Sequence, residues 1–151
     1  YYRFIFVGRY DVAPRYYSMI RALMTEYRLL NDRFVFTGPV PDEELAVYYR
    51  HAAVYVSMSE HEGFCVPLLE AMAADVPILA YSAAAVPDTL GGAGVQFSPK
   101  NLEHAAELLG ALVFDDELRG SVIAGQRRRL QDFGDVRIVS ELNEVLRLTA
   151  A

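Results

Sequence analysis

The chain has 151 residues, of which 53% are hydrophobic and 23% are charged, and its formal net charge is −6. This composition excludes a disordered chain, and the acidic balance argues against nucleic acid as a partner, because phosphate backbones attract basic proteins. The single cysteine, Cys65, excludes an internal disulfide and a cysteine-built zinc site, so a reducing, cytoplasmic location is expected. No window reaches the roughly 18 uninterrupted apolar residues that a membrane-spanning helix needs.

Short apolar runs alternate with helical patterns along the whole chain. The runs predict strands over residues 4–7, 34–36, 54–57, 77–81 and 94–97. Apolar side chains at helical spacing predict helices over residues 14–30, from 42 onward with Asp42 as N-cap, and over 67–74, 102–114, 117–132 and 137–148. Strands that alternate with helices of this length indicate a parallel sheet. We therefore predict an α/β fold, a Rossmann-like doubly wound sheet of about five strands with C-terminal helices covering it.

The start of the sequence indicates a piece of a longer protein. Residue 1 is Tyr, and residues 3–7 already have the pattern of a buried strand. We expect residues 1–151 to form one domain that is truncated at its N-terminal edge.

Three loops follow strands at the expected carboxyl edge of the sheet, where ligands bind in open α/β folds. They cover residues 8–11, 38–42 and 57–66. Gly8 and Gly38 end the first two strands, and a residue without Cβ lets the backbone approach a ligand closely. Gly8 lacks the glycine spacing of a dinucleotide-binding fingerprint, and no phosphate-loop Gly-Lys-Ser/Thr occurs. Dinucleotide oxidoreductases and phosphate-loop NTPases are therefore disfavoured.

The third loop carries the most chemistry. Gly63 allows a sharp turn, and Pro67 suits the first turn of a helix, where its missing N–H costs nothing. Backbone amides over residues 66–69, with the helix dipole behind them, predict an anion site suited to phosphate. Glu70 is expected in the first helical turn, and Glu62 just before the loop turns. Two carboxylates beside an anion site suit a phosphate ligand that carries hydroxyls on both sides, as a nucleotide sugar does.

These residues resemble a known family. Residues 62–70 match the Glu-x7-Glu signature of retaining glycosyltransferases of the GT-B fold, in the group that includes bacterial mannosyl- and glucosyltransferases. Matches to other motifs of this group occur at residues 36–45, 52–59, 77–80 and 86–94, so the resemblance covers most of residues 4–130. It implies the C-terminal, donor-binding half of such an enzyme.

The resemblance also implies roles for single residues. In this family the second glutamate, here Glu70, binds the ribose hydroxyls, and the first, here Glu62, contacts the transferred sugar at the reacting carbon. Glu62 is therefore the expected catalytic residue, with no metal and no cofactor. The expected donor-binding residues, many of them through the backbone, are Gly8, Val40, Gly63, Phe64, Cys65, Val66, Pro67, Leu68 and Glu70.

The implied activity is retaining transfer of a hexose from a UDP-, GDP- or ADP-linked sugar to a glycan or a lipid-linked saccharide. The expected partners are the nucleotide sugar and an N-terminal acceptor domain of the same protein. Peripheral contact of the whole enzyme with a membrane is compatible with this activity. The family's diphosphate-clamping Arg and Lys precede the first strand, outside residues 1–151. Arg9 and Arg15 lie in the wrong loop to replace them. We therefore expect weak donor binding and no catalysis by the isolated domain. The family usually has Gly or another small residue where Cys65 stands.

Simpler readings stay open beside these. Glu70 can compensate a helix dipole, while Glu62 and His61 can be solvated loop residues. The basic stretch Gln-Arg-Arg-Arg at residues 126–129 predicts a solvated helix face. The alternative is contact with anionic lipid or with the N-terminal domain. No Gly-x-Ser-x-Gly elbow supports a hydrolase triad from Ser57 or Ser59 with His61 and Asp88. The other function classes are a non-catalytic nucleotide- or sugar-phosphate-binding module and a receiver-type interaction domain, and Gly8-Arg9 stands where a receiver has acids.

Overall fold

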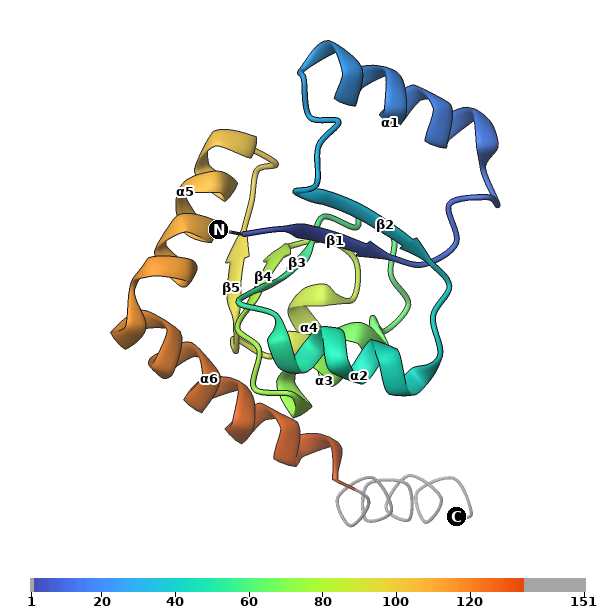
Figure 1. Cartoon of the computed structure of the whole chain (residues 1–151). Coiled ribbons are helices and arrows are strands. Elements are labelled where there is room, and N and C mark those ends of the chain that lie inside the picture. Colours follow the sequence, from blue (N-terminus) through green and yellow to red (C-terminus); the bar gives the residue numbers. More distant parts are fainter. Residues whose placement is uncertain (1, 135–151) are drawn as a thin grey trace. The chain divides into compact units, whose positions relative to one another are not determined.

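The five predicted strands form two parallel sheets rather than one. A computed structural model describes residues 2–134 and contains two compact units, Tyr1–Tyr48 and Tyr49–Ala151 (Figure 1). The first unit holds a two-stranded sheet of order β1-β2, and the second holds a three-stranded sheet of order β3-β4-β5. The predicted helix over residues 137–148 lies outside the described residues.

The first unit consists of two strands, a helix and the start of another. Its elements are β1 (Phe4–Val7), α1 (Pro14–Glu26), β2 (Phe34–Gly38) and most of α2 (Asp42–His51). Stacked aromatic pairs link the two strands, with ring centroids 5.2 Å apart for Phe4–Phe34 and 4.7 Å for Phe6–Phe36. Such cross-strand pairs are a main source of stability in a sheet of only two strands.

Two boundaries in this unit differ from the prediction. Helix α1 ends at Glu26 rather than near residue 30, because Arg28 adopts a left-handed conformation (φ 56°) that a helix cannot continue. Helix α2 begins at Asp42 instead of being capped by it, since the Pro41 carbonyl accepts the Leu45 N–H. The side chains of Asp42, Glu43 and Glu44 still lie in the positive first turn.

The prediction of a buried first strand is wrong for the described structure. The four side chains of β1 are 38–46% exposed. Their apolar, aromatic character had predicted cover on both faces, but β1 pairs only with β2 within this unit. A continuous apolar run therefore predicts a strand but does not establish that both of its faces are buried.

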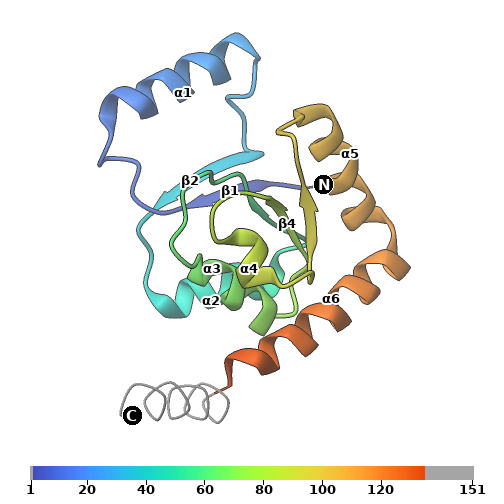
Figure 2. The same ribbon diagram turned by 180° about the vertical axis from the view of Figure 1, so that it is seen from behind.

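The second unit has its sheet covered on both faces, as predicted (Figure 2). Its sheet consists of β3 (Tyr55–Ser57), β4 (Ile78–Tyr81) and β5 (Val95–Phe97). Ile78 and Ala80 of the central strand point into a core with α3 (Val66–Ala73) and α4 (Val86–Leu90). Leu79 points the other way, into a core with α5 (Leu102–Phe114) and α6 (Asp116–Leu130). Strand alternation thus produces two core layers around β4.

Helix α4 is an element that the sequence prediction lacked. It has only five residues, and Gly91 ends it in a left-handed conformation (φ 55°). Arg129 of α6 lies against this end, with Nε 3.1 Å from the Thr89 carbonyl and Nη2 2.6 Å from the Asp88 carbonyl. A Cβ at position 91 would lie 2.6 Å from Arg129 Nε, so a larger residue there would force the Arg129 side chain to shift.

The predicted solvated face at residues 126–129 holds for Arg127 and Arg128, which are exposed, and is wrong for Gln126 and the half-buried Arg129. Gln126 is fully buried (0% exposed): its amide accepts the Ile78 N–H at 2.9 Å and donates to the Val76 carbonyl at 2.7 Å. Arg127 forms a bidentate pair with Asp75, and Arg129 binds α4 and Asp132. Gln126 therefore joins the inner face of α6 to the start of β4, while Arg127 and Arg128 remain on the surface. A short 3-10 turn (Gln131–Phe133) follows it.

No helix within residues 2–134 is both long and apolar enough to cross a membrane.

Candidate functional site

The third loop lies where predicted, between the end of β3 and the start of α3. Residue 65 is the N-cap of α3 and adopts a left-handed conformation (φ 61°, ψ 62°). Such angles suit glycine, which explains physically why the resembled family prefers glycine at this position. Here the residue is Cys65, whose side chain is 5% exposed and belongs to the core beneath α3. Burial, and then the nearby Glu62 carboxylate, raises the pKa of the Cys65 thiol.

The anion site at the start of α3 has fewer free amides than predicted. Pro67 has no N–H, and the Leu68 N–H donates to the Cys65 carbonyl at 3.0 Å. The positive end of the helix dipole remains, with Val66 as the first helical residue. Phosphate binding here would therefore depend on amides at the beginning of the helix and in the preceding loop.

Glu70 lies just beyond the first turn of α3 instead of within it, because the helix begins one residue earlier than predicted. The helix begins at Val66, so its first turn contains no acidic residue, and the reading of Glu70 as first-turn dipole compensation does not hold. The Glu70 side chain is half-buried and accepts a hydrogen bond at Oε2 from the Tyr49 hydroxyl, 2.9 Å away. Tyr49 comes from α2, and its side chain is also half-buried.

Glu62 is half-buried in the loop. Its carboxylate and the Glu70 carboxylate both affect the pKa of Tyr55. Burial first, and then the Cys65, Glu62 and Glu70 groups, raise the pKa of the Tyr55 hydroxyl above its usual range. Both predicted carboxylates thus act electrostatically on the same tyrosine of the second unit. In contrast, His61 is exposed.

The middle of the loop is tied to α4. The buried Thr89 hydroxyl donates to the Phe64 carbonyl at 2.6 Å. The Phe64 ring also meets Phe133 edge-on, with centroids 5.7 Å apart. Phe64, which is expected to contact the nucleotide-sugar donor, is therefore fixed both by its backbone carbonyl and by its ring.

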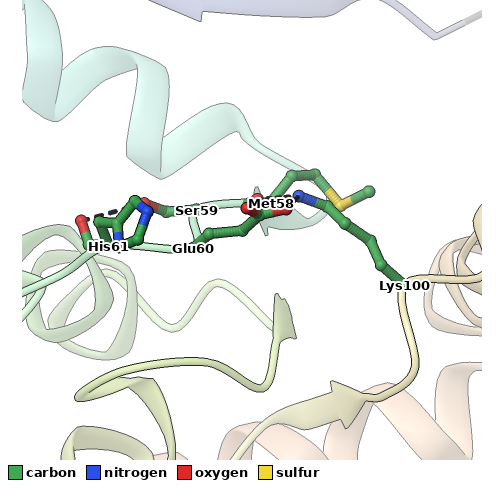
Figure 3. A network of polar contacts seen from close by, with 5 residues as sticks. All are labelled: Met58, Ser59, Glu60, His61 and Lys100. Atoms are coloured by element: carbon green, nitrogen blue, oxygen red, sulfur yellow. Dashed lines mark hydrogen bonds and ion pairs between the residues drawn. The ribbon is translucent and has the colours of Figure 1, made fainter.

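The first residues of the loop are tied to Lys100, the only lysine of the chain (Figure 3). Its Nζ donates to the Met58 carbonyl and to Glu60 Oε1, each at 2.8 Å, and lies 4.9 Å from the centre of the Tyr81 ring. The Lys100 ammonium lowers the pKa of the Glu60 carboxyl. Sequence reasoning assigned no role to this lysine.

We expect Lys100→Met to loosen the loop without unfolding the unit. Amide hydrogen exchange over residues 58–62 should become about two- to tenfold faster, because two hydrogen bonds of the loop are lost. The unfolding midpoint should barely change, since exposed ion pairs contribute little stability. Glu60→Gln is the matched control, since it removes the ion pair and leaves the Lys100–Met58 bond. Unchanged exchange in Lys100→Met would show that Lys100 does not order the loop.

The remaining predicted contacts lie in the first unit. Gly8 follows β1 with φ 135°, its N–H donates to the Gly38 carbonyl at 3.0 Å, and the space where a Cβ would be is open. Val40 is half-buried between β2 and α2. The predicted site residues therefore fall into two sets: Gly8 and Val40 in the first unit, and residues 62–70 in the second. Across residues 2–134 no group of three or more His, Cys, Asp or Glu side chains could hold a metal ion.

The described residues form a parallel α/β fold in which a helix N-terminus, favourable to anions, follows a strand at the edge where such folds bind ligands. The particular family follows from comparison. The family model described as "Glycosyl transferases group 1" matches residues 2–129, so the chain belongs to this family.

Relatives and solved structures agree with this assignment. The chain is 28% identical over 126 residues to the serotype-specific mannosyltransferase WbdA of Escherichia coli, which covers 81% of this chain and 16% of that protein. It is 36% identical over 96 residues to the MMP alpha-(1->4)-mannosyltransferase of Mycolicibacterium hassiacum. This match covers 61% of this chain and 23% of that protein. The chain thus spans less than a quarter of the length of these relatives.

The fold matches solved GT-B glycosyltransferase structures. The crystal structure of Anabaena Alr3699/HepE in complex with UDP superposes with a TM-score of 0.79 at 20% identity, over 97% of this chain and 41% of that one. Sucrose-phosphate synthase from Thermosynechococcus elongatus superposes with a TM-score of 0.78 at 27% identity. The match covers 97% of this chain and 39% of that one. The α/β, Rossmann-like prediction is therefore confirmed, with the strands divided between two sheets.

Proposed function

We propose that the chain is the donor-binding part of a retaining glycosyltransferase. It would bind a nucleoside-diphosphate sugar, from which the whole enzyme transfers a hexose to a glycan or lipid-linked acceptor. The observation that carries this proposal is the pair of half-buried carboxylates, Glu62 and Glu70, on either side of the start of α3. Family membership, the mannosyltransferase relatives and the likeness to a UDP-bound structure support it.

Each part of the donor has a proposed contact. The Glu70 carboxylate accepts hydrogen bonds from the ribose hydroxyls, and the start of α3 faces the diphosphate with the positive end of its dipole. Glu62 accepts from hydroxyls of the hexose and orients its ring at the reacting carbon. Gly8 and the backbone of Val40 would lie along the nucleoside.

The proposed reaction is governed by electrostatics. The bond between the anomeric carbon and the diphosphate oxygen breaks, and the acceptor oxygen bonds the same carbon with the original configuration kept. The nucleoside diphosphate leaves, together with the proton of the acceptor hydroxyl. A helix N-terminus stabilises the growing negative charge on the diphosphate, and a nearby carboxylate stabilises positive charge on the sugar ring.

The test is a titration of the ¹⁵N-labelled chain with UDP, GDP and ADP at low salt, followed by NMR, because this method detects binding with millimolar Kd. One nucleotide should give saturable shifts in the amides of residues 62–70, and it would identify the base. Inorganic phosphate at the same concentration is the control for binding of charge alone. No saturable shift with any nucleotide, or shifts that phosphate reproduces, would contradict the proposal.

A further inference from the structure

Glu70 is held by a hydroxyl group that comes from a different helix. The Tyr49 hydroxyl of α2 lies 2.9 Å from Glu70 Oε2 and 3.4 Å from the Pro67 carbonyl. A hydroxyl has one proton to donate, and the shorter distance assigns it to the carboxylate. Tyr49 and Glu70 are 21 residues apart in sequence, so only the folded chain brings them together.

The tyrosine itself is anchored. Its ring packs against the core beneath α3 and lies tilted against Tyr55, with centroids 6.0 Å apart. Burial, and then the Glu70 carboxylate, raises the pKa of the Tyr49 hydroxyl far above neutral. The hydroxyl therefore keeps its proton and stays a donor at neutral pH.

The geometry leaves most of the carboxylate available to a ligand. An ionised carboxylate has two oxygens and about four acceptor positions, and Tyr49 occupies one of them on Oε2. Oε1 and the remaining position on Oε2 can accept two vicinal hydroxyls. A glutamate side chain loses considerable rotamer freedom when it is ordered, so a partner that orders it beforehand improves binding.

We propose that Tyr49 is a positioning residue, which holds the Glu70 carboxylate in the orientation that receives the two ribose hydroxyls. This inference rests on the proposed function, because it assumes that Glu70 contacts the ribose. Tyr49 itself touches no part of the donor in this proposal.

The test compares a nucleoside diphosphate with its 2′,3′-dideoxy analogue, using the uridine, guanosine or adenosine pair that the NMR titration selects. Tyr49→Phe should weaken binding of the ribonucleotide about three- to tenfold, the effect of one hydrogen bond, and leave the dideoxy analogue unchanged. The variant keeps the ring that packs in the core. In a Glu70→Ala background the same change should have no effect.

Tyr48→Phe is the matched control. Tyr48 neighbours Tyr49 on α2, and its hydroxyl likewise donates to a glutamate, Glu44 Oε1, at 3.0 Å. This variant should bind both nucleotides as the unaltered chain does.

Four outcomes are possible. Unchanged ribonucleotide affinity in Tyr49→Phe would overturn the inference, and so would an equal loss for both nucleotides, which indicates a merely structural role. If the unaltered chain binds the two nucleotides equally, the ribose contact of the proposed function fails instead. If the unaltered chain prefers the ribonucleotide and Tyr49→Phe reduces that preference, the result supports both the ribose contact of Glu70 and the positioning role of Tyr49.

Discussion

Gln126→Leu is expected to lower the free energy of unfolding by about 2–5 kcal/mol. Gln126 is fully buried, and its amide pairs with the Ile78 N–H and the Val76 carbonyl at the edge of β4. Leucine has a similar volume but no polar atom, so both backbone groups would be left buried without this partner, at about 1–3 kcal/mol each. Denaturant unfolding at neutral pH, followed by circular dichroism, measures the loss.

Two further variants make this test specific. Gln131→Leu applies the same chemical change at an exposed position just after α6 and should alter stability by no more than about 0.5 kcal/mol. Gln126→Glu retains an acceptor for the Ile78 N–H but, when ionised, no donor for the Val76 carbonyl, and it buries a charge. A Gln126→Leu protein as stable as the unaltered chain would show that the two bonds contribute nothing.

Local patterns predicted the elements of this fold better than their pairing. The apolar runs and helix signals placed all five strands and, for α5, both ends, because these depend on neighbouring residues. The division into two sheets depends on contacts between distant strands, on which the spacing of side chains has no bearing. Helix α4 escaped prediction because five residues are too few for a helical period to show.

Gln126 shows how a local pattern misleads. Next to three arginines it resembles part of a solvated face, yet it is among the most buried side chains of the chain. Its partners, Val76 and Ile78, lie 50 and 48 residues earlier, so no local signal marks them. Two of the arginines that follow it also have distant partners: Arg127 pairs with Asp75, and Arg129 binds the end of α4.

The candidate site divides in the same manner. The spacing of Glu62, Gly63 and Glu70 was sufficient to predict a loop and helix with two carboxylates, because all three lie on one continuous segment. Their supports come from elsewhere: Tyr49 holds Glu70, Thr89 holds the Phe64 carbonyl, and Lys100 holds the loop start. The one available signal was an inward-facing tyrosine on a helix before the loop, because a buried hydroxyl needs a partner.

Glu70→Ala is expected to weaken binding of the preferred nucleoside diphosphate by about 1.5–3 kcal/mol, roughly 10- to 150-fold in Kd. This is the scale of hydrogen bonds to a charged group, and the proposal assigns Glu70 both ribose hydroxyls. NMR titrations of the unaltered and altered chains measure the difference in Kd. Glu103→Ala removes an equal charge from an exposed position in the first turn of α5 and should leave the Kd unchanged.

Glu70→Ala also leaves the half-buried Tyr49 hydroxyl without its nearer acceptor, so a second variant must separate the two losses. Glu70→Gln keeps the side-chain shape and an acceptor oxygen for Tyr49 but removes the negative charge. If the carboxylate binds ribose, this variant should also lose affinity, by less than alanine, and bind the dideoxy analogue as before. If Glu70→Ala and Glu70→Gln both bind the ribonucleotide with unchanged affinity, Glu70 does not contact the ribose, whatever its place in the motif.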